Sequence, residues 1–259
     1  MIHNLFSFHG ADHKVGTTMI TQSVAEIIST NHPNLRILFI AMNGRESTEY
    51  IRESPAGIDS MKFHIDNKMI TGEDFLKTCT HKGNLYIMSG ISNETEERYY
   101  HPEMAKYLLE EVAPEFDLVF ADCGNELDNG LAVGTLSVSE EVFLVASQQE
   151  SVIRRYEKNR KILDDLGIRI SILIINKYYE QDPFGLSYIA SRLEIEKEKF
   201  LKVETASYSR QAEIDYKTLL EYKNEGYLQN IIAVANNILN KNGIIEIQRQ
   251  RKSRWKSFI

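Results

Sequence analysis

The sequence predicts an α/β fold with a doubly wound, mostly parallel sheet and helices on both of its faces. Short, nearly continuous apolar runs recur along the chain, as expected of strands that are buried on both faces. Stretches with helical periodicity separate these runs, and such a strand–helix–strand alternation is typical of parallel sheets. No repeat, linker-like stretch or low-complexity tract interrupts the alternation. Residues 1–243 are therefore predicted to form one α/β domain.

The expected elements follow one another in a regular order. The expected strands are Leu5–Phe8, Arg36–Ala41, Asn84–Met88, Asp117–Asp122, Glu141–Ala146, Arg169–Ile175 and a weaker one at Phe200–Val203. The expected helices are Thr18–Ser29, Pro102–Val112, Ser151–Leu166, Gly185–Glu194 and Asp215–Leu239. Residues 42–83 are weakly patterned, and we expect short helices and loops there over one edge of the sheet.

The composition is that of an ordinary soluble globular protein. The chain has 259 residues, of which 42% are hydrophobic and 26% are charged, and its formal net charge is −7. This charge argues against a general nucleic-acid binder. The only two cysteines, Cys79 and Cys123, exclude a disulfide framework and a cysteine-based zinc module. No apolar run reaches the roughly 18 to 20 residues that span a bilayer, and the first residues lack a signal-peptide pattern. We therefore expect a cytoplasmic protein.

The segment after the first expected strand has the context of a phosphate-binding loop. It reads Leu5-Phe-Ser-Phe-His-Gly-Ala-Asp-His-Lys-Val-Gly-Thr-Thr18, from a buried strand through a turn into a helix. Phosphates favour helix N-termini at the carboxyl ends of parallel strands. If Gly16 is the last glycine of a P-loop pattern, Thr18 becomes the Mg²⁺ ligand. The same alignment puts Ala11 at the first glycine and Thr17 at the lysine, so the ordinary pattern is broken at the lysine.

This loop resembles the deviant Walker loop of the MinD/ParA family of P-loop ATPases, and within that family the TadZ/CpaE pilus-assembly branch. The family loop reads Lys-Gly-Gly-X-Gly-Lys-Thr-Thr, and the pilus branch often has Gly-Gly-Val-Gly-Thr-Thr. The segment His13-Lys14-Val15-Gly16-Thr17-Thr18 is similar to the latter over Val-Gly-Thr-Thr. Residues 116–122 resemble the family strand that ends in the Walker B aspartate, and residues 172–177 resemble a later strand. Residues 84–90 and 142–147 resemble two others.

The resemblance implies ATP and Mg²⁺ as cofactors. The residues that it implies for nucleotide binding are His13, Lys14, Val15, Gly16, Thr17, Thr18 and Asn176, and those for the metal are Thr18 and Asp122. Other interpretations stay open from the residues alone. Asp122 could cap a helix at the strand end, Asn176 could be a turn residue and His13 a solvated one. The loop itself could be a glycine turn in a protein that binds no nucleotide.

Several positions depart from the family pattern. Asp12 stands where the family has a lysine that reaches the partner's nucleotide, and Thr17 stands where it has its second lysine. Lys14 could supply a charge, although glycine normally holds its position. After the second strand, Ala41 and Asn43 replace the family's Asp-X-Asp, whose second aspartate helps to position the attacking water. Because phosphoryl transfer depends on positioning and charge neutralisation, we expect nucleotide binding to survive and hydrolysis to be weak or absent.

The function implied by the resemblance is that of an ATP-binding localisation or scaffold protein that assists pilus or secretion-system assembly at the membrane. An active MinD/ParA-type positioning ATPase is the alternative, and an interaction module without nucleotide is a third class. The resemblance also implies a homodimer, with pilus or secretion-system proteins as further partners. No specific nucleic acid is expected as a partner.

The last residues form a basic tail on an acidic body. The stretch Ile244–Ile259 contains five basic residues, one glutamate and the aromatic residues Trp255 and Phe258. Wound as a helix, it gathers its apolar residues on one side and its basic residues elsewhere, with Arg251 as the exception. We expect it to contact an anionic membrane surface, which would make the protein peripheral at the inner face of the plasma membrane. A disordered tail, or a basic patch for a protein partner, is the alternative.

Overall fold

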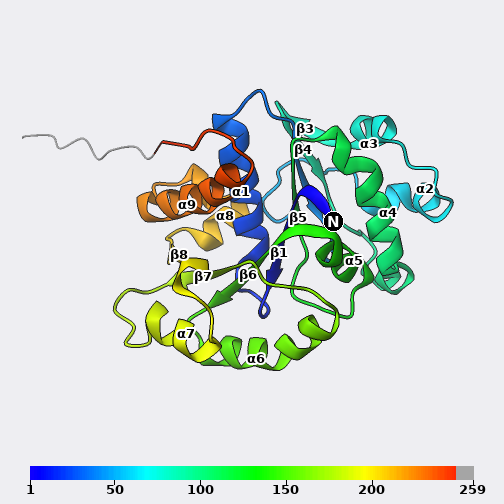
Figure 1. Cartoon of the computed structure of the whole chain (residues 1–259). Helices are drawn as coiled ribbons and strands as arrows, with labels where there is room; N and C mark the ends of the chain where they lie inside the picture. Colours follow the sequence, from blue (N-terminus) through cyan, green and yellow to red (C-terminus); the bar gives the residue numbers. More distant parts are fainter. Residues whose placement is uncertain (249–259) are drawn as a thin grey trace, which may run out of the picture.

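A central sheet flanked by helices forms the body of the computed structural model, which describes residues 1–248 (Figure 1). The strands lie in the order β3-β4-β2-β5-β1-β6-β7-β8, and each neighbouring pair is parallel except β3 with β4. The bounds are β1 (Ile2–Gly10), β2 (Ile37–Ala41), β3 (Thr80–Lys82), β4 (Leu85–Met88), β5 (Leu118–Asp122), β6 (Ser139–Ser147), β7 (Ile172–Tyr178) and β8 (Phe200–Glu204). The predicted fold class, doubly wound and mostly parallel, is confirmed.

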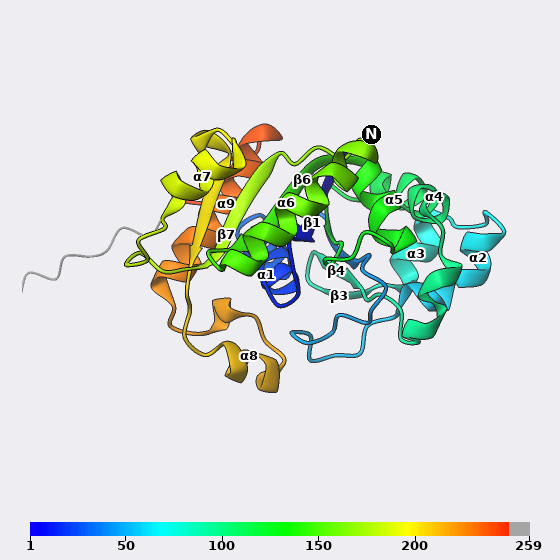
Figure 2. The same cartoon turned by 90° about the horizontal axis from the view of Figure 1, so that it is seen from below.

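Helices cover both faces of the sheet, because chain crossovers leave its centre in both directions. The longer helices are α1 (Thr17–Asn31), α4 (Pro102–Val112), α5 (Gly130–Val138), α6 (Glu150–Asp165), α7 (Leu186–Leu193) and α9 (Glu225–Lys241). The shorter ones are α2 (Lys62–Asp66), α3 (Gly72–Thr78) and α8 (Ser209–Asp215). Right-handed crossovers place α1, between β1 and β2, on the face opposite α5, between β5 and β6. Accordingly, α1 packs on α9, while α4 packs on α5 and α6 lies against β6 (Figure 2).

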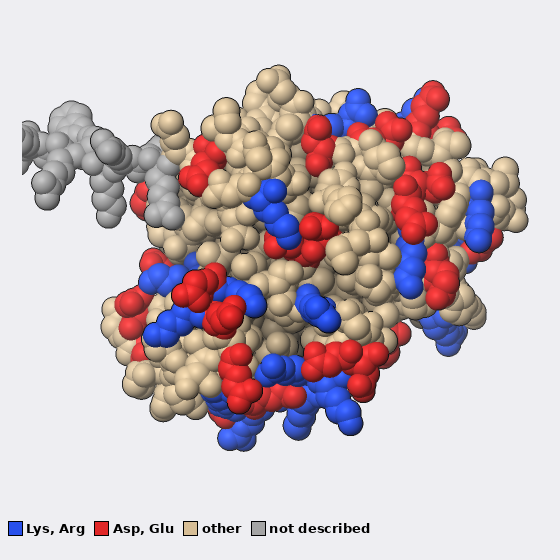
Figure 3. Space-filling model, viewed as in Figure 1, with Lys and Arg blue, Asp and Glu red and all other residues tan. Residues whose placement is uncertain are grey.

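The core lies on the central strands. Every residue of β2 and β5 is buried, and so are the last six residues of β1. Phe8 of β1 stacks on Phe143 of β6 with ring centroids 4.8 Å apart, so aromatic packing ties the two neighbouring strands together. Apart from Asp122 of β5, the carboxylate, lysine and arginine side chains lie at or near the surface, where acidic and basic residues are interspersed, including along α6 (Figure 3).

Strand register brings three loops together at one edge of the sheet. Asp122, the last residue of β5, pairs with Phe8 of β1 and with Ala41 of β2. The loops that follow β1, β2 and β5 therefore start side by side at the carboxyl edge. Because β1 is where the chain changes its direction of travel across the sheet, this edge is where doubly wound folds place their ligands.

Two helices differ from those expected. The expected helix Asp215–Leu239 starts too early: α8 ends at Asp215, Tyr216 has φ 54°, and α9 begins only at Glu225 and then covers the rest of the expected helix. Between them, the side chain of Thr218 donates to Glu26 of α1, so the chain turns inward instead of continuing as a helix. Helix α5 is an addition to the predicted helices, and it contains glycines, which disfavour helices. A Cβ on Gly134 would collide with the carbonyl oxygen of Pro102, so this glycine permits close packing against α4.

The start of the expected tail helix is also wrong. Residues 244–248 carry no helix, and Ile247 is buried against the domain. The Asn236 side chain in α9 holds Ile247 in place: it accepts from the Ile247 amide at 2.8 Å and donates to its carbonyl at 3.0 Å. The remainder of the expected tail, residues 249–259, lies outside the described residues. Among residues 1–248, no helix combines the length and the apolar character needed to cross a bilayer.

Candidate phosphate-binding site

The loop between β1 and α1 has the backbone shape of an anion cradle. The Gly10 amide donates to the Gly124 carbonyl at 2.6 Å, and the Ala11 amide donates to the Val145 carbonyl at 2.8 Å, so the segment just after β5 and strand β6 anchor the start of the loop. Lys14 (φ 57°) and Gly16 (φ 94°) are both left-handed, and the residue between them is not. Such alternation turns successive N–H groups toward one point and makes an anion-binding concavity. Helix α1 then begins at Thr17 and adds the positive end of its dipole.

Thr18 and Asp122 meet at the base of this loop, although they are 104 residues apart in the sequence. The Thr18 hydroxyl donates to Asp122 Oδ2 at 2.6 Å. Asn43, from the loop after β2, donates through Nδ2 to the same oxygen at 3.1 Å, and the Gly124 amide donates to Oδ1 at 3.0 Å. A hydroxyl and a carboxylate in contact under a phosphate cradle are the oxygen ligands that Mg²⁺ uses at nucleotide sites.

Burial makes Asp122 a poorly compensated anion. The carboxyl is fully buried, and this raises its pKa to about 6, against the opposing hydrogen bonds from Thr18, Gly124 and Asn43. Three neutral donors do not replace the water that a buried carboxylate loses, and no basic side chain is among its hydrogen-bond partners in the described chain. A divalent cation would supply the missing positive charge, so the donor set fits Mg²⁺.

The loop is also tied to the end of β7. Asn176, which is buried, donates through Nδ2 to the Val15 carbonyl at 2.7 Å, and Lys177 donates through Nζ to the Lys14 carbonyl at 2.7 Å. These two bonds hold the carbonyls of the loop away from its amide side. A Cβ on Gly16 would lie 2.5 Å from Asn176 Nδ2, so the tether also requires glycine there.

A cavity of about 550 Å³ opens beside the loop and has room for a nucleoside. Its walls come from the loop, from the segment after β2, from the ends of β7 and β8 and from α8 and α9. The lining residues include Lys14, Gly16, Thr18, Glu49, Tyr50, Asn176, Lys177, Glu204, Thr205, Ala206, Glu213 and Tyr227. The lining thus combines residues of the loop with aromatic and carboxylate side chains.

The outer turn of the loop carries an ionic cluster that the sequence did not reveal. Asp12 accepts from its neighbour's amide, that of His13, at 2.8 Å and pairs with Arg155 of α6, with Oδ1 and Nη1 3.2 Å apart. His13 Nε2 lies 3.0 Å from Glu126 Oε1, and Arg155 Nη2 lies 3.7 Å from the same oxygen. His13 is therefore partnered by a carboxylate of the loop after β5, and α6 reaches the rim of the site.

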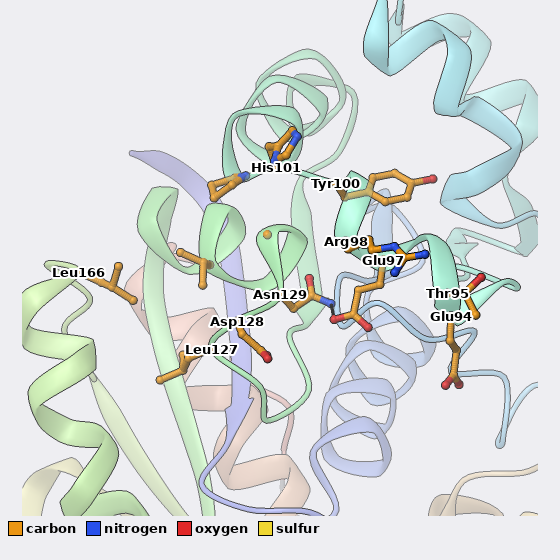
Figure 4. A pocket seen from close by; sticks show the side chains of 13 residues that line it. Glu94, Thr95, Glu97, Arg98, Tyr100, His101, Leu127, Asp128, Asn129 and Leu166 are labelled. Carbon is orange, nitrogen blue, oxygen red and sulfur yellow. Dashed lines mark hydrogen bonds between the residues drawn. The ribbon is translucent and has the colours of Figure 1, made fainter.

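A second and larger cavity, of about 680 Å³, lies on the far side of the loop after β5 (Figure 4). Glu97 and Asn129 face each other in it, and Asn129 Nδ2 donates to Glu97 Oε1 at 2.7 Å. Asn129 also caps α5 by accepting from the Ala132 amide. The polar side chains Glu97 and Asn129 of this cavity thus bond to each other and to the start of α5, and the cavity has no phosphate cradle. The smaller cavity, which lies beside the loop between β1 and α1, is therefore the better candidate for a ligand site.

The structure brings the residues predicted for the site together. Gly16, Thr17 and Thr18 open α1, Lys14 and Asn176 line the cavity, and Asp122 contacts Thr18. Val15 is a buried residue that can contribute only through its backbone. Ala41 ends β2 next to Asp122, and Asn43 occupies the space beside the carboxylate. Lys14 has φ 57°, in the region that favours glycine, which explains why glycine is the usual residue there.

The sheet order and the position of this loop are those of the P-loop NTPase fold. No protein-family profile and no curated protein matches the chain. Solved structures do match. A ParA family ATPase from Chlorobium tepidum has a TM-score of 0.79 at 15% identity, over 90% of this chain and 98% of that one. The MinC:MinD cell division complex of Aquifex aeolicus matches with a TM-score of 0.71 at 14% identity, over 96% of this chain and 99% of that one. MinD of Pyrococcus horikoshii, complexed with Mg-ADP, matches with a TM-score of 0.68 at 15% identity, over 92% of this chain and 98% of that one. The chain thus has the fold of ParA and MinD ATPases.

Proposed function

We propose that this chain is a MinD/ParA-type protein that binds ATP with Mg²⁺ and uses the bound state for localisation or scaffolding rather than for turnover. The contact between the Thr18 hydroxyl and Asp122, at 2.6 Å beneath a left-handed loop, carries this proposal. The fold supports it, because structural neighbours include a plasmid partition protein bound to AMPPNP and an McdA–ATP complex. The role in pilus or secretion-system assembly, like that of TadZ/CpaE, rests on the likeness of the loop sequence.

Each element of the site has a role in this proposal. Backbone amides of Val15 to Thr18 and the α1 dipole would hold the phosphates, and Asn176 would border the base. Thr18 and Asp122 would hold Mg²⁺, Thr18 directly and Asp122 through water. When bound, the metal neutralises phosphate charge. It also gives Asp122 the counter-charge that this buried carboxylate lacks, so nucleotide and metal are expected to bind together.

Weak or absent hydrolysis follows from the side chains at the reacting end. Asn43 donates to Asp122 and to Ser47 Oγ at 2.6 Å, and its Oδ1 accepts from the Arg45 amide at 3.0 Å. An amide committed in this way is neither a carboxylate nor free to orient an attacking water. Thr17 offers a hydroxyl where a lysine would neutralise charge in the transition state. The site therefore keeps binding groups and lacks turnover groups.

Calorimetry with ATP and Mg²⁺, followed by a phosphate-release assay on the same sample, tests this proposal. We expect saturable binding, with ~2.7 kcal/mol of added stability at a hundredfold excess over Kd. The combined substitution Thr18→Ala and Asp122→Ala should abolish the rise in melting temperature. Thr30→Ala, at the exposed far end of the same helix, should leave it intact. No heat and no shift for the unaltered protein at millimolar ATP would rule out nucleotide binding.

We further propose a homodimer, partners from a pilus or secretion system, and a cytoplasmic location with contact to the inner membrane surface. The basic tail supports the membrane contact, because each basic residue near an anionic surface contributes about 1 kcal/mol. Since Ile247 is buried in the domain, the lipid-binding part would begin after Gln248. Liposome co-sedimentation tests it: binding should require anionic lipid, fall with salt and vanish when residues 249–259 are deleted. Equal pelleting of the truncated protein would remove this role from the tail.

A further inference from the structure

Arg155 brings a positive charge to the rim of the phosphate loop from outside the loop. It lies in the second turn of α6, a helix that follows β6, the neighbour of β1 in the sheet. Its guanidinium pairs with Asp12 at 3.2 Å and lies 3.7 Å from Glu126 Oε1. Both contacts are ion pairs, and neither is a short hydrogen bond. The side chain is 38% exposed, so part of its donor set faces solvent.

Without Arg155, the rim would repel a nucleotide. Asp12 and Glu126 place two carboxylates at the outer turn of the loop, and the amide of His13 fixes the orientation of Asp12. A triphosphate carries several negative charges, and two anions nearby oppose its entry at low ionic strength. Lys14 and Lys177 are the basic residues lining the cavity, and Lys177 is already bonded to a loop carbonyl. Arg155 is the basic side chain that contacts both rim carboxylates within residues 1–248.

We propose that Arg155 binds the terminal phosphate of a nucleoside triphosphate held by the loop of its own chain. This assignment rests on the proposed nucleotide-binding function. An arginine fork matches phosphate oxygens bidentately, and an arginine supplied within the same chain is a known way to neutralise a transferring phosphoryl group. The carboxylates of Asp12 and Glu126 hold the guanidinium near the loop until the phosphate, with its higher charge, replaces them.

A contact with the terminal phosphate gives the site a preference for the triphosphate. A diphosphate lacks the group that Arg155 contacts, while its remaining phosphates still meet the amides of the loop. Arg155 thus contributes to the affinity for ATP and not to that for ADP. A purely structural arginine, which only ties α6 to the loop after β5, would support both nucleotides equally. The two roles can therefore be separated by measurement.

Neighbouring residues provide matched variants. Arg154 has the same charge on the same helix turn, but it pairs with Glu150 at 2.7 Å and its side chain is 69% exposed. Arg155→Lys keeps the charge and loses the fork. Asp12→Asn releases Arg155 from its closest partner and removes one rim anion. Removing this anion favours ATP by charge alone, so the informative comparison is Asp12→Asn with and without Arg155→Ala: if Arg155 serves the phosphate, the tightening of ATP binding should be smaller in the double variant.

Calorimetry with ATP-Mg²⁺ and with ADP-Mg²⁺ decides the assignment. Arg155→Ala should raise the Kd for ATP at least ~10-fold, the loss expected for a charged hydrogen bond, and change that for ADP less than ~3-fold. Arg155→Lys should recover part of the loss, Arg154→Ala should match the unaltered protein, and Asp12→Asn should tighten ATP more than ADP.

Equal weakening of both nucleotides by Arg155→Ala, or no weakening, would overturn the role of Arg155 while leaving the proposed function in place. An unaltered protein that binds neither nucleotide would instead overturn the proposed function, and the assignment with it. Circular dichroism and melting of each variant without nucleotide show whether it is folded. If Arg155→Ala is unfolded, Arg155→Lys takes its place: a weaker Kd for ATP with an unchanged Kd for ADP supports the phosphate contact, and equal changes in the two Kd values overturn it.

Discussion

The two halves of the candidate site differ in how the chain has built them. The binding half, with Gly16, Thr18 and Asp122, has a left-handed loop, a helix N-terminus and a hydroxyl on a buried carboxylate. The reacting half carries Asp12 and Asn43 at positions where the resemblance leads us to expect charged groups of other kinds. On the proposed function, one half is retained and the other lost, which would mean that phosphate binding and phosphoryl transfer place separate demands on a sequence. Substitutions can therefore act on each half separately.

The largest effect is expected from Asp122→Asn in the binding half. Because burial raises the pKa of Asp122 to about 6 from 3.8, the charged form destabilises the nucleotide-free fold at neutral pH. The substitution should raise the free energy of unfolding at pH 7.5 by up to about 3 kcal/mol and abolish the stabilisation by ATP-Mg²⁺. Urea melts with and without nucleotide measure both.

Asp117→Asn is the matched control for this change. Asp117 precedes β5 at its other end, is exposed and accepts from the Arg36 amide at 2.6 Å. It should give no gain in stability and leave the response to nucleotide unchanged. A loss of stability in Asp122→Asn would mean that the hydrogen bonds to its carboxylate outweigh the burial of the charge, and Asp122 would then not be the poorly compensated anion of the binding half.

His9 makes the stability of the same half depend on pH in the opposite direction. It is buried at the end of β1, burial lowers its pKa to about 4 from 6.5, and its Nδ1 has no partner in the described structure. The unfolded chain takes up this proton first as pH falls, so stability should fall by about 3 kcal/mol between pH 6.5 and 4. As pH falls from 6 to 3.8, Asp122 raises the free energy of unfolding by a similar amount, because the folded state takes up the proton of this carboxylate first.

The two opposing contributions can be separated by removing one at a time. In the unaltered protein the two contributions nearly cancel, so together they should change the free energy of unfolding only slightly with pH. His9→Leu should unmask the gain from Asp122 and become relatively more stable on acidification, whereas Asp122→Asn should unmask the loss from His9. Urea midpoints at pH 7, 6 and 5 provide the measurement, and parallel curves for the three proteins would refute both pKa shifts.

A smaller effect is expected where the loop backbone is left-handed. Gly16→Ala adds a Cβ at φ 94°, 2.5 Å from Asn176 Nδ2, and should destabilise the protein by about 2 kcal/mol and weaken ATP binding. Lys14→Gly removes the side-chain strain of a non-glycine residue at φ 57°, and should stabilise the protein by less than ~1 kcal/mol. Thermal melts and calorimetry check both. Equal signs for the two variants would contradict the left-handed loop.

Much of the binding half could be predicted from the sequence, because it depends on short-range patterns. Apolar runs predicted the central strands, and the loop pattern with its spacing paired Thr18 with Asp122. The same reasoning failed where tertiary contacts decide. Helix α5 is glycine-bearing and fits only because α4 packs closely on it, and the inward turn at Thr218 depends on Glu26 in a distant helix. The ion pair between Asp12 and Arg155 joins the loop after β1 to helix α6, and no local sequence pattern predicts it.

The smallest effect is expected from restoring a single charge to the reacting half. Thr17→Lys returns the second lysine of the family loop, but Asn43 remains bonded to Asp122, Ser47 and the Arg45 amide and cannot orient water. Phosphate release by Thr17→Lys should therefore stay at the level of a Thr18→Ala control, as should release by the unaltered protein. Adding Asn43→Asp to Thr17→Lys supplies the missing carboxylate beside the metal position, and this pair should release more phosphate than either single variant. Turnover by the unaltered protein clearly above the control would instead identify an active positioning ATPase, and the division between the two halves would fail.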